Sequence, residues 1–407
     1  MTTIVLVVFG VVYLGMILGG LPFLQLDRTG VALLGAIALV ALGALTPEQA
    51  ALAIHLPTLL LLFSFMVISA QMRLGGFYTR VTLDLADLHV SPPALLALVI
   101  AVVGTLSAVF SNDVICLAIA PVLADACLAR RLDPVPYLLG LACAANVGSA
   151  ATLIGNPQNM LIGQVLELSF AGYFLEAIVP VLLGLAATWG ILAWQTRGRW
   201  RTVLDDPPPE RRHDYAVYNR WQTAKGLGVA GALVGAFLLS DVPREVAALA
   251  GAGLLLMSRR LHSHKMLGLV DWELLILFIG LFVVNHALAQ TGLAALALAW
   301  LGAAGVPLTD TGPLFVVTLV LSNVVSNVPA VMLLLPAATE PFSGPLLALV
   351  STLAGNLLIV GSIANIIVVD AARRRGIAID WRTHARAGVP VALATLCVTA
   401  VWFALRH

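Results

Sequence analysis

Apolar stretches of membrane-spanning length recur along the whole chain, from Ile4 to Phe403, and this pattern restricts the fold more than any motif does. A helix needs about 20 apolar residues to cross the hydrocarbon core of a bilayer. The composition agrees, because 60% of the 407 residues are hydrophobic and only 11% are charged. A soluble domain of this size does not have such a composition. The sequence therefore predicts an all-α integral membrane protein with many spans.

Charge and motifs exclude several other classes of protein. The net charge is +1 without a basic tail, so we expect no nucleic-acid partner. The four cysteines lie in apolar segments without CxxC spacing, which argues against a disulfide framework and a zinc site. Both lysines, Lys225 and Lys265, lack the surroundings of a P-loop, and neither HExxH nor GxSxG occurs. We therefore expect no cofactor and no enzymatic activity, with an integral-membrane enzyme as a remote alternative.

The chain contains an internal duplication. At an offset of 215 residues, LSAVFSN (106–112) falls on LSNVVSN (321–327). At an offset of 206 residues, GNPQN (155–159) falls on GSIAN (361–365). The matches follow one another in the same order at nearly the same spacing, so we interpret them as two copies of one fold.

The basic residues predict that the two copies have opposite orientations. Cytoplasmic loops of membrane proteins are enriched in Lys and Arg. If the segment 196–225 is cytoplasmic, counting spans outward from it puts all of the 22 basic residues except Arg244 and Arg406 on that side. The loop after GNPQN has no basic residue, whereas the loop after GSIAN is rich in arginine. We expect inverted repeats in the cytoplasmic membrane, with both termini extracytoplasmic.

The predicted architecture is two inverted repeats of five transmembrane helices, 1–195 and 226–407, joined by the cytoplasmic linker 196–225. The expected spans are 3–23, 29–46, 56–72, 136–168 and 171–195, followed by 226–241, 243–260, 271–290, 345–372 and 387–405. Each repeat also has a re-entrant helical hairpin, 92–129 or 311–339, that begins and ends on the same side. The spans 136–168 and 345–372 are expected to be broken helices, because Pro157 removes a backbone donor and Gly155 and Gly361 relax the backbone.

Polar residues fall at the turns of both predicted hairpins, as SND (111–113) and SN (326–327). Irregular backbone at membrane depth is tolerated only where it is buried in protein or lines a watery cavity. In secondary transporters, discontinuous helices of inverted repeats build the central site. Such a site would explain why polar turns stand inside apolar segments.

Among these polar turn residues Asp113 is the most costly to place in a membrane, because an aspartate at the centre of a span costs about 2.5–3.5 kcal/mol of insertion free energy. A coupling cation would offset this cost, either Na⁺ as a direct ligand or H⁺ on the carboxyl group. The alternative is a capping role for Asp113 at the helix that starts at Val114. The second copy has Val328 at the matching place, so two ion sites would be unequal.

At these residues the chain resembles the ion transporter superfamily, which includes arsenite efflux permeases, D-type sodium/proton antiporters, citrate–metal transporters and divalent anion/sodium symporters. The resemblance covers nearly the whole chain, through SNDVICLAIAP, NVGSAATLIGNPQNMLIG, DWELLILFIGLFVV, SNVPAVMLLLP and GNLLIVGSIANIIV. In the symporters both turns read Ser-Asn-Thr and hold Na⁺ and a substrate carboxylate. Here Asp113 and Val328 replace the threonines, and the Asn-Asp pair is more similar to the arsenite permeases and the antiporters.

The resemblance implies two groups of site residues. The cation-coupling group comprises Ser111, Asn112, Asp113, Ser326 and Asn327, with Na⁺ at the hairpin turns as the one metal expected. The substrate-binding group comprises Thr152, Gly155, Asn156, Asn159, Gly361, Ser362 and Asn365. Cys116, one turn beyond Asp113, is a weaker candidate for contact with a thiophilic metalloid.

We therefore expect a cation-coupled secondary transporter, driven by H⁺ or Na⁺, that moves a small inorganic or carboxylate anion by alternating access. An arsenite/antimonite efflux permease and a sodium/proton antiporter are the alternatives. The expected partners are the lipid bilayer and a small anion or metalloid. The residues leave open the coupling ion, the direction of transport and the oligomeric state, for which a homodimer is one option.

Overall fold

The computed structural model describes residues 1–21, 24–201 and 216–406, so residues 202–215 of the expected linker lie outside it. The first half consists of α1 (Thr2–Leu18), β1 (Gly20–Leu21), β2 (Leu26–Asp27), α2 (Arg28–Ala41), α3 (Pro47–Ala53), α4 (Leu56–Leu74), α5 (Phe77–Asp87), α6 (Pro92–Val109), α7 (Asn112–Ala129), α8 (Pro134–Ser149), α9 (Pro157–Val165) and α10 (Phe170–Gln195). The second half consists of α11 (Arg220–Leu239), α12 (Arg244–Leu256), α13 (Ser263–Leu267), α14 (Trp272–Gln290), α15 (Leu293–Ala303), α16 (Thr311–Val325), α17 (Asn327–Leu334), η1 (Leu335–Ala337), α18 (Ser343–Ala354), η2 (Ile359–Gly361), α19 (Ile363–Arg373) and α20 (Trp381–Arg406). The two short strands pair antiparallel, and the rest of the described architecture is helical.

Seven helices within the described ranges are long and apolar enough to cross a membrane, namely α4, α6, α7, α10, α11, α14 and α20. This number establishes a multi-pass membrane protein, in agreement with the expected all-α class. The expected spans 29–46 and 243–260 contain shorter helices than the hydropathy suggested, with 14 residues in α2 and 13 in α12. Fourteen residues reach about 21 Å at 1.5 Å per residue, against a hydrocarbon core of about 30 Å. In the first of these spans the backbone turns at Gly43, whose φ is 72°.

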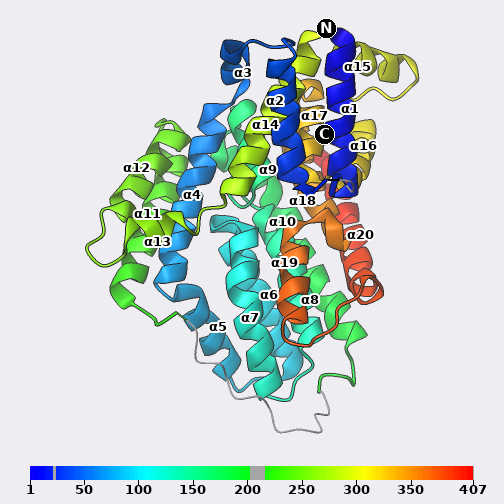
Figure 1. The fold of residues 1–407 in the computed structure, drawn as a ribbon. Coiled ribbons are helices and arrows are strands. Elements are labelled where there is room, and N and C mark those ends of the chain that lie inside the picture. Colours follow the sequence, from blue (N-terminus) through cyan, green and yellow to red (C-terminus); the bar gives the residue numbers. More distant parts are fainter. Residues whose placement is uncertain (22–23, 202–215, 407) are drawn as a thin grey trace.

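Figure 1 shows helices from the two halves of the chain lying side by side, and the helix contacts define two groups of packed helices. In one group α4 packs against α11 and α12, while α2 packs against α1 and α14. In the other group α8 packs against α6, α7, α10 and α19, while α16 packs against α18 and α10 against α20. Helices from the two halves of the chain are therefore interleaved in both groups, and the second group contains the polar turns.

Two helix pairs are joined by very short turns. Phe110 and Ser111 separate α6 from α7, and Ser326 alone separates α16 from α17. Because α6 and α7 have 18 residues each and are apolar, each is long enough to cross the membrane by itself. The first hairpin is thus longer than a shallow re-entrant loop requires.

Two further helices are interrupted where the sequence places Gly and Pro. The backbone leaves the helix between Ser149 and Pro157, and again between Ala354 and Ile363. At the first interruption Pro157 opens α9, and the Asn156 side chain caps it by accepting a hydrogen bond from the Asn159 amide at 2.9 Å. Proline suits this first helical position because its missing N–H would have no intrahelical partner there.

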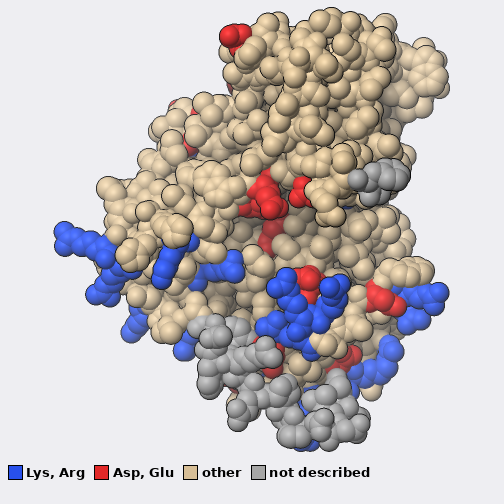
Figure 2. Space-filling model, in the orientation of Figure 1, with Lys and Arg blue, Asp and Glu red and all other residues tan. Residues whose placement is uncertain are grey.

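Basic side chains collect at one end of the molecule, in the lower half of Figure 2. Backbone hydrogen bonds bring the loops of that end together: Asp133 donates to Trp200 at 3.0 Å, and Asn219 donates to Gly75 at 2.9 Å. Acidic side chains gather nearer the middle of the same face (Figure 2). The described parts of the linker therefore lie at the basic end, beside the loops that precede α5 and α8.

Candidate functional site

Both hairpin turns and both helix interruptions meet at one cavity of about 40 Å³. Its lining comprises Asn112, Asp113, Pro157, Gln158, Leu274, Ser326, Asn327, Val328, Ser362 and Ile363. Residues 112 and 327 lie 215 positions apart in the chain, so only the folded structure makes them neighbours. The polar turns therefore belong to a single site.

Four helices begin at this cavity. Asn112, Pro157, Asn327 and Ile363 are the first residues of α7, α9, α17 and α19, and all four line the cavity. A helix N-terminus presents unpaired N–H groups and the positive end of the helix dipole. The backbone alone thus gives the cavity a positive bias.

The first hairpin turn is bonded to the first interruption, because the Asn112 amide donates to the Gly155 carbonyl at 3.1 Å. Its side-chain Nδ2 donates to Asn146 Oδ1 at 3.0 Å, whereas its Oδ1 is buried and has no partner among the described residues. Ser111 is the residue before α7 and makes no side-chain capping bond. Asn112 thus lines the cavity and has one buried oxygen without a partner in the described part of the chain.

Asp113 is half-buried, lines the cavity and lies in the first turn of α7. A carboxylate is favoured at a helix N-terminus by the dipole. The capping alternative places this side chain before a helix at Val114, but α7 begins at Asn112 and has no side-chain capping bond at that end. The geometry therefore favours a carboxylate that faces the cavity.

The second hairpin turn is held in an unusual backbone conformation. Ser326 has φ 76° and ψ 161°, a region that is occupied almost only by glycine. The next residue, Asn327, has a buried Oδ1 without a partner in the described structure, as does Asn323 in the preceding turn of α16. Leaving a buried polar atom unpaired costs about 1–3 kcal/mol. An oxygen-seeking ligand at this turn would remove that cost.

The residues expected to bind substrate in the first interruption lie behind the cavity and bond to one another. Asn156 and Asn159 are fully buried, and Thr152 is nearly so. Asn159 Nδ2 donates to the Thr152 carbonyl at 3.1 Å and to the Tyr173 hydroxyl at 3.2 Å. Gly155 is packed so closely that a Cβ would meet the Ser149 and Ser107 carbonyl oxygens. These residues shape the break, and Gln158 of the same segment reaches the cavity.

In the second interruption, too, some of the expected residues line the cavity and others are buried behind it. Ser362 lines the cavity, whereas Asn365 is fully buried and donates from Nδ2 to the Gly355 and Leu358 carbonyls at 2.8 and 3.1 Å. Gly361 lies against Asn323, whose Oδ1 would be 3.2 Å from an added Cβ. Asn365 therefore fixes the loop between α18 and α19 rather than facing the cavity.

Five of the twelve expected site residues line the cavity, namely Asn112, Asp113, Ser326, Asn327 and Ser362. The other seven are not among its lining residues, and Cys116 is fully buried. The sequence reasoning missed Asn146, Gln158, Asn323, Thr352 and Asn356. A usable signal was present for Asn146, because the offset of 206 residues that aligns GNPQN with GSIAN also aligns Asn146 with Thr352. In the described part of the chain, no group of three or more His, Cys, Asp or Glu side chains could hold a metal ion.

Two helical hairpins and two interrupted helices surround one polar cavity. This arrangement is typical of membrane transporters. The chain belongs to the citrate transporter (CitMHS) family, whose model matches residues 4–354. Transport rather than catalysis is the activity of this family.

Three relatives with similar sequences are named as transporters. The silicon efflux transporter LSI3 of Oryza sativa subsp. japonica is 28% identical, over 97% of this chain and 95% of the relative. The uncharacterized transporter Rv2685 of Mycobacterium tuberculosis is 29% identical over 85% of each chain. The putative transporter arsB of Dictyostelium discoideum is 23% identical, over 92% of this chain and 87% of the relative.

A solved structure shares the fold. The crystal structure of the Alcanivorax borkumensis YdaH transporter, described as having an unusual topology, aligns with a TM-score of 0.56. The alignment covers 99% of this chain and 96% of that one at 17% sequence identity. At this identity the likeness concerns the architecture alone.

Proposed function

We propose that this transporter is driven by a cation gradient, Na⁺ or H⁺, and moves a small inorganic or carboxylate anion across the cytoplasmic membrane by alternating access. The observation that carries the proposal is the meeting of two hairpin turns and two helix interruptions at one cavity that contains Asp113. Elements from both halves of the chain form its walls, so a movement between them can open it to either side.

Oxygen atoms support the cation part of the proposal. The Asn112 and Asn327 side chains line the cavity and each has a buried Oδ1 without a partner among the described residues. Amide and carboxylate oxygens are the ligands that hard cations prefer. The cavity of about 40 Å³ exceeds the about 10–15 Å³ that one water-sized particle needs on the same measure, so a small ion fits.

Helix ends support the anion part. Among the described residues that line the cavity none is Lys or Arg, so no cationic side chain binds an anion there. The N-termini of α7, α9, α17 and α19 supply positive dipole ends instead. An anion and a cation bound together would also neutralise one another in a medium of low dielectric.

The inverted repeat and the topology belong to the same proposal. α12 packs on α4 while α14 packs on α2, as a two-fold relation between the halves requires. With the basic end in the cytoplasm, the segment 196–225 is cytoplasmic and both termini are extracytoplasmic. Reporter fusions after residue 201 and at both termini test this orientation. A reporter that places residue 201 outside the cell contradicts it.

Efflux of a small uncharged oxyacid is the second candidate. Two relatives are named as a silicon efflux transporter and as arsB, which point to small hydroxylated solutes. Neutral solutes need no cationic side chain, in keeping with the lining of the cavity. Export in exchange for protons would then use Asp113 in the same role.

The experiment is transport by the purified protein in proteoliposomes. A Na⁺ gradient and a H⁺ gradient are imposed and dissipated in turn, with citrate, succinate, sulfate, phosphate, arsenite and silicic acid as solutes. Uptake of an anion that stops with one gradient supports the first candidate. Proton-dependent movement of arsenite or silicic acid alone supports the second. Na⁺/H⁺ exchange without any solute contradicts both and indicates an antiporter.

A further inference from the structure

Asn146 connects the first hairpin turn to the second helix interruption. It lies in α8, is 2% exposed, and accepts at Oδ1 from Asn112 Nδ2 at 3.0 Å and from Ser362 Oγ at 2.9 Å. Its Nδ2 donates to Asn356 Oδ1 at 2.8 Å and to Asn365 Oδ1 at 3.2 Å. A side-chain amide has two donor hydrogens and two acceptor lone pairs. All four are used here, and three of the four partners lie in the other half of the chain.

Thr352 makes the reverse connection. It lies in α18, is 1% exposed, and its hydroxyl accepts from Asn156 Nδ2 at 3.1 Å and from Gln158 Nε2 at 3.2 Å. The same hydroxyl donates to Asn159 Oδ1 at 3.3 Å. One donor and two acceptors are the full capacity of a hydroxyl. Thus α8 and α18, the helices before the two interruptions, each carry one side chain with all its hydrogen bonds made. Each of these side chains bonds to the interruption in the other half of the chain.

The two connections differ in one respect. Asn146 also bonds a hairpin-turn residue, Asn112, whereas the hydrogen bonds of Thr352 all go to the first interruption. Because Asn112 Nδ2 donates to Asn146, the side-chain amide of Asn112 is held in one orientation, and its buried Oδ1 has no partner among the described residues. A cation that coordinates this oxygen and shifts the Asn112 side chain would therefore also shift Asn146. The shift of Asn146 would then reach its partners Ser362, Asn356 and Asn365.

We propose that Asn146 is a positioning residue that transmits cation binding at the first hairpin turn to the second helix interruption. This inference rests on the proposed cation coupling. Removing its Nδ2 donors weakens this transmission, because only the Ser362 bond to Oδ1 then remains: the first turn still binds the cation, but α19 responds much less. Thr352 does not serve this transmission, since it does not bond Asn112.

Reporter cysteines at the two ends of this connection test the inference. The exposed Cys397 is replaced by Ser, and Val114→Cys on α7 or Ile363→Cys on α19 is added. Maleimide labelling is measured on the full chain in nanodiscs. In one titration Na⁺ replaces choline at constant ionic strength. In the other the pH is varied, and the labelling rate is divided by that of the denatured protein to remove the pH dependence of the thiol reaction itself. In the parent we expect the cation to change labelling at both positions by about tenfold, equivalent to about 1.4 kcal/mol.

Asn146→Asp is the decisive variant, because it keeps the shape and the acceptor oxygens, while its carboxylate has no hydrogen to donate to Asn356 and Asn365 and its protonated form has one in place of two. We expect the cation response to persist at position 114 and to fall below about twofold at position 363, a difference near 1 kcal/mol. Asn356→Ala removes one of these two acceptors and leaves Asn146 itself unchanged, so it must lower the response at position 363 in the same direction if Asn146→Asp does not fold. In Thr352→Val both responses should remain.

Each other outcome overturns a different statement. If neither cation alters labelling in the parent, the proposed cation coupling fails. If the parent responds and the folded Asn146→Asp and Asn356→Ala variants respond equally at both positions, transmission through Asn146 fails. A loss at both positions in a folded variant also overturns it, because Asn146 would then serve binding itself. Loss at position 363 in Thr352→Val would show that the connection is not specific to Asn146.

Discussion

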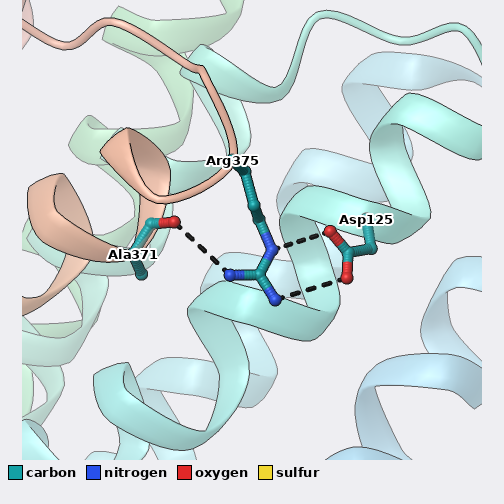
Figure 3. A network of polar contacts seen from close by, with 3 residues as sticks. All are labelled: Asp125, Ala371 and Arg375. Carbon is teal, nitrogen blue, oxygen red and sulfur yellow. Dashed lines mark hydrogen bonds and ion pairs between the residues drawn. The ribbon is translucent and has the colours of Figure 1, made fainter. Parts of the chain in front are cut away.

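Arg375 and Asp125 form an ion pair between the two halves of the chain. Arg375 Nε lies 2.7 Å from Asp125 Oδ1, and Arg375 Nη2 lies 3.3 Å from Oδ2 (Figure 3). The side chains are only 21% and 15% exposed. Asp125 belongs to α7 and Arg375 lies two residues beyond the end of α19, and these two helices begin at the cavity and pack against each other. The pair therefore holds together the helix ends that lie away from the cavity.

Asp125→Asn should lower the free energy of unfolding by about 1.5–3 kcal/mol, the range for hydrogen bonds to charged groups. Asp84→Asn is the matched control, because Asp84 pairs with Arg80 on the surface with side-chain exposures of 54% and 57%. Exposed pairs of this spacing contribute about 0.3–0.5 kcal/mol. Thermal unfolding of the purified protein in detergent measures both. Equal shifts in Tm would contradict a stabilising role for the partly buried pair.

Asp113→Asn should weaken or abolish the dependence of transport on the coupling cation, because it removes the carboxylate from the cavity. If the ion is H⁺, transport by the variant should no longer change with pH. If the ion is Na⁺, the Na⁺ concentration for half-maximal transport should rise by at least about tenfold, or about 1.4 kcal/mol. Asp113→Glu keeps the charge and should retain part of the response. Initial rates in proteoliposomes measure this, and an unchanged cation dependence in Asp113→Asn would exclude Asp113 as the coupling residue.

Gly155→Ala should destabilise the protein and prevent transport. The added Cβ would meet the Ser149 and Ser107 carbonyl oxygens, which belong to backbone that cannot easily move. Overpacking of this kind costs about 1–3 kcal/mol. Gly231→Ala on α11 is the control, since nothing lies within 4 Å of its added Cβ. Expression, Tm and transport are compared, and equal behaviour of the two variants would show that the break at Gly155 can relax.

Ser326→Gly and Ser326→Ala should separate backbone strain from the role of the hydroxyl. Both remove the hydroxyl, but only glycine is at ease at φ 76° and ψ 161°. The Gly variant should therefore unfold at a higher temperature than the Ala variant, by the equivalent of about 1–3 kcal/mol. If the hydroxyl is a cation ligand, both variants should lose cation affinity equally. Equal Tm values would mean that the turn holds no strain.

Local sequence signals located the polar turns and the interruptions well. Gly155 and Pro157 disfavour a continuous helix wherever they occur, so the end of α8 and the start of α9 could be predicted from neighbouring residues alone. Helix length was less predictable, because Gly43 has φ 72° and ends the segment of α2 although the hydropathy continues to residue 46. Hydropathy reports solubility in lipid, whereas the end of a helix depends on the backbone conformation of single residues.

Exposure to the cavity could not be predicted in the same way. Asn159 and Asn365 have the residue type of ligands, yet both are fully buried and bond to protein groups. Asn112 and Asn327 have the same side chain, yet both line the cavity and each has a buried Oδ1 without a partner among the residues that the structure describes. A side-chain amide can serve either purpose, and its neighbours in space decide which.

The sequence by itself determined a multi-pass helical membrane protein with polar turns near residues 111 and 326 and helix breaks near residues 155 and 361, because apolar length, Gly, Pro and hydrogen-bonding capacity act locally. Only the tertiary structure decided that Asn146 bonds across to Ser362 and that Asp125 pairs with Arg375. These partners are 216 and 250 residues apart. Contacts at such separations are set by how whole helices pack, and no local property of either residue specifies them.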